Sequence, residues 1–109
     1  MAVRAYLSEK WKKIIDVRVS AVTLTTTKSK VLSANPNRFE YVVINLGTYD
    51  SYFSPMTDVS TTKGMLVGPA GGAFSANVDE DGELPTMELW GIADGGSTTL
   101  FVLEVIAVG

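Results

Sequence analysis

The sequence contains no cysteine and no histidine. Without cysteine, these residues can form neither disulfide bonds nor thiolate metal sites. Without histidine, the chain lacks the side chain on which most general acid–base, triad and zinc chemistry depends, because only histidine ordinarily titrates near neutral pH. Serine nucleophiles would have no imidazole to activate them. We therefore expect a non-enzymatic protein with no catalytic residues, no resident metal and no cofactor.

Long apolar runs are also missing. No stretch approaches the ~18 consecutive apolar residues that indicate a transmembrane helix, and the start MAVRAYLSEKWKK lacks the apolar core of a signal peptide. We expect no membrane partner and synthesis in the cytoplasm of a host cell.

What the chain does contain favours one small β domain. It has 109 residues, of which 46% are hydrophobic and 19% charged, enough for a single core. Serine and threonine together contribute 20 residues and valine 13, and this bias is typical of strands.

The net charge of −3 is distributed unevenly. Residues 1–30 carry a net charge of +5, whereas residues 31–109 carry −8. A basic start on an acidic body indicates either an ordinary solvated edge or an arm that binds an acidic partner. A nucleic-acid partner is not expected, because the few basic residues would give a weak interaction and the acidic body would repel phosphate.

Apolar residues alternate with polar ones over residues 3–21, where eight of ten odd positions are apolar. Nineteen residues are too many for an ordinary strand. We divide the chain into a basic N-terminal arm, residues 1–14, anchored by Trp11, and a β domain, residues 15–109. The first strand is expected over residues 15–24, with Asp16, Arg18 and Ser20 facing water.

Short apolar segments then recur every 8–12 residues, separated by glycine, proline and polar turns. Further strands are expected at residues 30–32, 39–46, 49–54, 73–77, 87–93 and 98–108. About seven or eight strands with this spacing predict an all-β fold, a single antiparallel β-sandwich (jelly-roll-like) or a barrel.

The last strand is apolar on both faces. One face carries Leu100, Val102, Ile106 and Val108, interrupted only by Glu104. So short a chain cannot bury many two-sided strands, so a second subunit should cover the surplus face. We predict a homo-oligomer, for which a trimer is one arrangement, with these four apolar residues and Trp11 at the interface.

Three further segments could carry chemistry or recognition. Asp79, Asp81 and Glu83 could offer oxygen ligands to a hard cation, but their spacing departs from the calcium loop and favours a solvated turn. Asn35-Pro36-Asn37-Arg38 is expected to be a structural loop and not a catalytic one. Arg38 could pair with a carboxylate on an adjacent strand, which contributes little if the pair is exposed, so we expect Arg38→Ala to leave the fold intact.

Aromatic side chains crowd a third segment, which contains Tyr49, Tyr52 and Phe53. They either fill the core or stand at the surface, where rings recognise proteins or stack on sugars.

Four motifs in order carry a resemblance to a known group of proteins. The segment VLSANPNR leads into the strand FEYVVINLG, and the aromatic strand YDSYFSP follows. A glycine-rich loop and the strand pair LWGIADGGSTTLFVLEV come next. Over residues 16–106 the chain thus resembles small all-β accessory proteins of tailed phages and related double-stranded-DNA viruses, which decorate the head, the head–tail junction or the tail surface.

The resemblance implies a virion structural protein of a bacteriophage or archaeal virus, which associates with itself and docks on a capsid or tail protein. The alternative left open by the sequence is a carbohydrate- or receptor-binding module that uses Tyr49, Tyr52 or Phe53.

Overall fold

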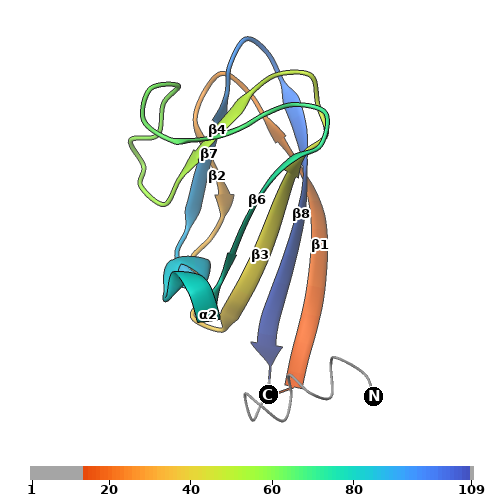
Figure 1. Ribbon diagram of the computed structural model, residues 1–109, viewed down its shortest axis with the longest axis vertical. Coiled ribbons are helices and arrows are strands. Elements are labelled where there is room, and N and C mark those ends of the chain that lie inside the picture. The colour runs from red at the N-terminus through yellow and green to blue at the C-terminus, as the bar shows by residue number, and fades with distance from the viewer. Residues whose placement is uncertain (1–13, 109) are drawn as a thin grey trace.

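The computed structural model describes residues 14–108, which form two antiparallel sheets packed face to face (Figure 1). The strands are β1 (Ile14–Leu24), β2 (Ser29–Leu32), β3 (Arg38–Asn45), β4 (Ser51–Ser54), β5 (Met65–Val67), β6 (Gly72–Asn77), β7 (Leu89–Ala93) and β8 (Thr98–Val108). The helical turn α2 (Val78–Asp81) and the 3₁₀ turn η1 (Leu84–Thr86) lie between β6 and β7. The predicted sandwich is confirmed, and its sheets do not close into a barrel.

The strand order is that of a jelly roll. Sheet A has the order β1-β8-β3-β6, and sheet B has the order β2-β7-β4-β5. Successive strands therefore alternate between the sheets in two Greek keys, except for β4 and β5, which are neighbours in sheet B. The predicted arm, residues 1–14 with Trp11, lies outside the described residues except for Ile14, where β1 begins. No helix within residues 14–108 is long and apolar enough to cross a membrane.

The core lies between the sheets and is built from alternate residues of each strand. Tyr41 and Val43 of β3, Phe53 of β4 and Leu89 of β7 are almost entirely buried there. Sheet B is short, so it covers only part of sheet A. The α2–η1 segment lies beside the remaining inner part of β3, where Pro85 is buried (Figure 1).

A buried polar network links β3 to β4 and β8. The Asn45 side-chain amide donates to the Tyr49 carbonyl at 2.8 Å and to the Val67 carbonyl at 3.2 Å. Its oxygen accepts a hydrogen bond of 2.6 Å from the Thr98 hydroxyl and one of 3.0 Å from the Gly47 N–H. Every polar atom of this fully buried side chain is thereby satisfied, as burial requires.

Replacing Asn45 tests whether this network stabilises the fold. Asn45→Asp replaces an amide donor with a carboxylate that faces two carbonyl oxygens, so we expect the free energy of unfolding to fall by at least about 2 kcal/mol. Urea denaturation measures this change. The control is Asn35→Asp, because the Asn35 side chain only accepts a hydrogen bond from the Asn37 N–H and an aspartate can do the same. Equal stability of the two variants would contradict the assignment of Asn45.

Candidate assembly interface

The outer face of sheet A is largely apolar over β1, β8 and β3, and becomes polar toward β6 and at Glu40. From β1 to β6, successive rows across this face are Ala21, Phe101, Ile44 and Ala73, then Val19, Leu103, Val42 and Ser75, then Val17, Val105, Glu40 and Asn77. Outward positions of a solvated sandwich are usually polar, because only the inner faces are covered. We call these twelve residues the outer face of sheet A.

Nothing within residues 14–108 packs as a second layer on this face, because sheet B and the α2–η1 segment lie on the inner side (Figure 1). Val17 is 50% exposed and Val19 is 62% exposed. Contiguous apolar surface of this kind marks interaction sites in soluble proteins. The sequence analysis expected only Asp16, Arg18 and Ser20 of this strand to face water, whereas Val17 and Val19 on its opposite face are exposed as well.

The face of β8 that we predicted to be an interface is instead covered within the chain. Leu100 and Val102 are completely buried between the sheets, and Ile106 is 2% exposed. The assignment of these three residues to a subunit interface is therefore wrong, because sheet B and η1 already fill the space beside the inner face. The outward face of β8, with Phe101, Leu103 and Val105, is the one left partly open. The side chains of Val108 and Trp11 lie outside the described residues.

Arg38 explains why the sequence analysis mistook the inner face of β8 for the outer one. Its side chain is 2% exposed, not exposed as expected, and it reaches the inner face of sheet A. Nη1 donates to Glu104 Oε1 at 2.8 Å and Nε donates to the Pro85 carbonyl at 2.8 Å. Nη2 donates to the carbonyls of Ser33 and Met87 at 2.9 and 3.0 Å. One guanidinium thus holds β8, η1 and the loop after β2 together.

Tyr41 lies beside this guanidinium. The Arg38 Cζ atom stands 5.8 Å from the centre of the Tyr41 ring, a distance compatible with a cation–π contact. Burial raises the pKa of Tyr41 to about 12, and the positive charge of Arg38 partly opposes that rise. The tyrosine therefore stays neutral at physiological pH, as a core residue must.

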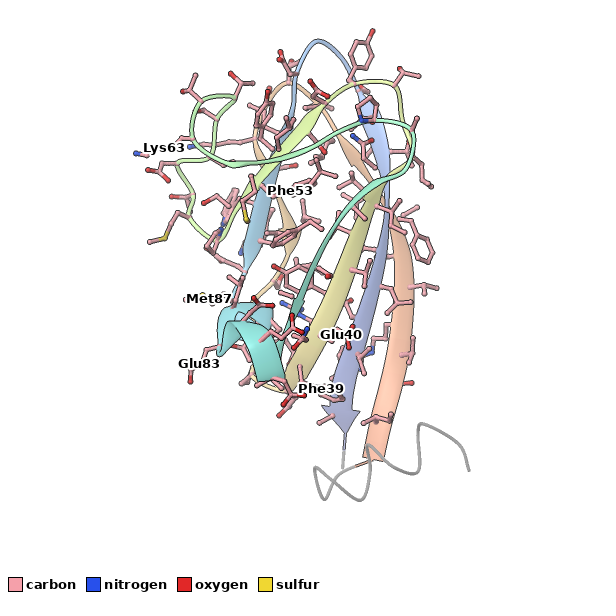
Figure 2. The ribbon with its side chains drawn as sticks, in the orientation of Figure 1. Phe39, Glu40, Phe53, Lys63, Glu83 and Met87 are labelled. Carbon is pink, nitrogen blue, oxygen red and sulfur yellow. The ribbon has the colours of Figure 1, made fainter. Side chains whose placement is uncertain are left out.

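The three aromatic residues proposed for surface recognition separate in the fold. Phe53 is completely buried between the sheets, so its assignment to a surface site is wrong (Figure 2). Tyr52 is half-buried on the outer side of sheet B, between Ile92 and Leu66. Tyr49 is 42% exposed, with its ring against the Gly95-Gly96 turn. The three rings do not form one stacking platform.

The acidic turn is a capped helical turn. The Asn77 side chain accepts a hydrogen bond from the Glu80 N–H, and the Asp81 carboxylate accepts one from the Asn77 N–H, both at 2.9 Å. Glu83 lies beyond the helix on the outside of the fold (Figure 2). Asp79, Asp81 and Glu83 do not converge, and no group of three or more acidic side chains within residues 14–108 is arranged to hold a metal ion.

Neither a protein-family model nor a curated protein matches this sequence. One solved structure with a similar fold comes from Bacillus endospore appendages, described as a novel family of disulfide-linked pili. The match has a TM-score of 0.55 and 11% sequence identity, and it covers 89% of this chain and 91% of that chain. At this identity the likeness establishes a shared fold.

Proposed function

We propose that this chain is a non-enzymatic structural protein that associates with copies of itself and docks on the capsid or tail of a virus. The outer face of sheet A carries this proposal, because its rows of valine, leucine, isoleucine and phenylalanine have no second layer within the described residues. Burying such a face in an assembly removes apolar surface from water at a gain of roughly 25 cal/mol per Å².

Two further observations support a structural role. The fold is shared with a subunit of disulfide-linked pili, and the order of motifs resembles that of virion accessory proteins. These 109 residues contain no cysteine, so disulfide links like those of the pili are not available to them. Contacts that these residues make between copies are therefore not disulfide-linked, and an apolar face can supply such contacts without a covalent bond.

Val19→Asp should weaken association while the fold persists. The side chain is 62% exposed, so a charge there costs little in the isolated chain but is costly once the face is covered. Size-exclusion chromatography coupled to light scattering measures the oligomer fraction, and a thermal melt checks the fold.

The matched control is Leu66→Asp, which places the same charge on a residue 59% exposed on the other sheet. If Leu66→Asp dissociates the oligomer and Val19→Asp does not, the assembly surface lies on sheet B and the present assignment is wrong.

The proposed location in a virion is tested separately, by looking for the chain in purified particles. Mass spectrometry of purified virions should find this chain in many copies per particle, as a decorating component requires. Its absence from particles made in cells that express it would contradict the proposed location and leave self-association to be judged separately.

A further inference from the structure

The outer edge of β6 lacks the usual protection of a sheet edge. In the order β1-β8-β3-β6 this strand pairs only with β3, and its register does not shift over residues 72–77 (Figure 1). Natural edges are protected by charged side chains, proline, a bulge or short length. β6 has six residues, GAFSAN, with no charge and no proline. The other edge strands are protected, because β1 carries Asp16 and Arg18, β2 has a register shift and β5 has three residues.

Alternate backbone groups of β6 point away from β3. The Leu46 N–H, directly after β3, donates to the Thr99 carbonyl of β8 at 2.9 Å. Even-numbered residues of β3 therefore bond to β8, and odd-numbered ones bond to the even-numbered residues of β6. Ala73 and Ser75 thus direct both their N–H and their C=O outward, and no hydrogen bond within residues 14–108 uses these groups.

The helical turn after β6 limits the part of the edge that another strand can reach. The Asn77 N–H also points outward, but it donates to Asp81 Oδ2 at 2.9 Å. The edge available to another strand is therefore residues 72–76, and its middle residue is Phe74. The Phe74 ring lies on the inner face, 5.9 Å from the centre of the Tyr41 ring, yet it is only half-buried. A neighbouring strand would cover the remaining part of this ring.

We propose that β6 pairs antiparallel with β6 of a second copy around a two-fold axis at Phe74. This inference rests on the proposed self-association and names one contact through which it occurs. In that register Ala73 of each copy lies opposite Ser75 of the other, and the two residues exchange both hydrogen bonds. The two four-stranded sheets then become one eight-stranded sheet, and their outer faces join.

The open backbone groups select this register. Antiparallel neighbours must present the same face, so the axis must pass through one residue of the strand. An axis at Phe74 pairs every outward group of Ala73 and Ser75. An axis at Ser75 instead leaves Ala73 opposite Asn77, whose N–H is already bonded. An axis at Ala73 leaves Ser75 opposite Gly71, whose N–H donates to a carbonyl of β3.

The side chains at the axis also suit a second copy. The two Phe74 residues meet at a position without backbone hydrogen bonds, where side chains come closest and aromatic pairs stabilise a sheet. On the outer face, the small uncharged Ala73 and Ser75 lie opposite each other. The acidic turn α2 of one copy lies at the end where the uncharged loop of the other, residues 68–71, precedes β6. The register thus keeps the two acidic turns apart.

Cross-linking tests the register. The chain has no cysteine, so Ala73→Cys and Ser75→Cys each introduce a single thiol. The axis places residue 73 of one copy opposite residue 75 of the other, with the Cα atoms about 5.5 Å apart, which a disulfide can span. A mixture of the two variants should form covalent dimers under mild oxidation, measured by non-reducing electrophoresis. Each variant alone should form far fewer, because identical positions lie diagonally, roughly 7–8 Å apart.

The cross-linking pattern can contradict the proposal in two ways. Dimers formed by Ser75→Cys alone as readily as by the mixture would exclude the axis at Phe74. The absence of dimers from every sample, with the protein still oligomeric, would exclude the pairing of β6 altogether.

Ser75→Pro tests the backbone contact. Proline is tolerated on an edge strand where the N–H points away from the sheet, so the fold should persist in a thermal melt. The substitution removes two of the four hydrogen bonds of the contact, so association should weaken roughly tenfold. Sedimentation velocity measures this change. The cross-links involve no proline, so they decide the question if Ser75→Pro does not fold.

The matched control is Leu66→Pro, at the edge of sheet B. The Asp94 N–H donates to the Asp50 carbonyl, so even-numbered residues of β4 bond to β7. Leu66 lies opposite Tyr52 and therefore also directs its N–H outward. Leu66→Pro should leave association unchanged. Equal weakening by both proline variants would contradict a contact specific to β6.

Two further results separate this inference from the proposed function. If Ser75→Pro associates like the wild type while Val19→Asp dissociates, the edge pairing is wrong and the proposed function stands. Hydrogen exchange of the Ser75 amide should slow as the protein concentration rises, and equal protection at every concentration would show that the chain covers its own edge. A wild-type protein that sediments as a monomer contradicts the proposed function itself.

Discussion

Arg38→Ala is expected to lower the free energy of unfolding by roughly 3–5 kcal/mol, because it removes one partner of a buried ion pair. The substitution leaves the Glu104 carboxylate without its 2.8 Å partner and leaves three backbone carbonyls without a donor. It also frees η1 from β8, so the loss exceeds that of a simple surface contact. Urea denaturation measures the difference in the free energy of unfolding, with the same dependence on urea concentration applied to both proteins.

The control for Arg38 is Arg18→Ala. Arg18 contacts Asp16 at 3.6 Å and is 56% exposed, so its loss should cost less than about 1 kcal/mol. If Arg38→Ala were as mild as Arg18→Ala, the guanidinium would not hold the fold together as described. Arg38→Lys should recover only part of the stability, because an ammonium cannot reproduce the forked donor geometry.

Val102→Asp should unfold the protein or cost more than about 4 kcal/mol, because it places an unpaired charge at a site with no solvent access. Val102 lies on the inner face of β8, within the cluster of buried apolar side chains between the two sheets. Circular dichroism and a thermal melt measure the loss of fold.

The comparison for Val102 is Val19→Asp, on the outward face of the neighbouring strand. It carries the same substitution but should keep the melting temperature within a few degrees of the wild-type value. A folded Val102→Asp variant that has only lost its oligomeric state would restore the original prediction that this face lies between subunits.

Most strands were predictable because alternation and turn residues have local causes. The expected first strand, residues 15–24, differs from β1 by one residue, and the expected last strand, residues 98–108, coincides with β8. The helical turn α2 was missed, because four residues are too few to show a helical period. Its one sequence signal was Asn77, a residue type favoured as an N-cap.

The choice of inner face on β8 was not predictable, because both faces are apolar and alternation cannot separate them. Glu104 interrupts one face and made it look like the outer one. In the structure that carboxylate points inward, because it pairs with Arg38 at the start of β3, 66 residues earlier in the chain. One long-range ion pair thus explains two wrong predictions, the exposed Arg38 and the outward face of Leu100 and Val102.

The position of β1 at the end of sheet A was also beyond the sequence. Alternation shows that residues form a strand, but strand order follows from the fold, and only the order places β1 at an edge.

Sedimentation equilibrium of the unmodified protein over a dilution series tests the central claim most directly. The account predicts a mass above the 11.7 kDa of one chain at micromolar concentration, falling toward that value only on dilution. A single species of one chain's mass at every concentration would contradict it, because the outer face of sheet A would then be stable in water without a partner.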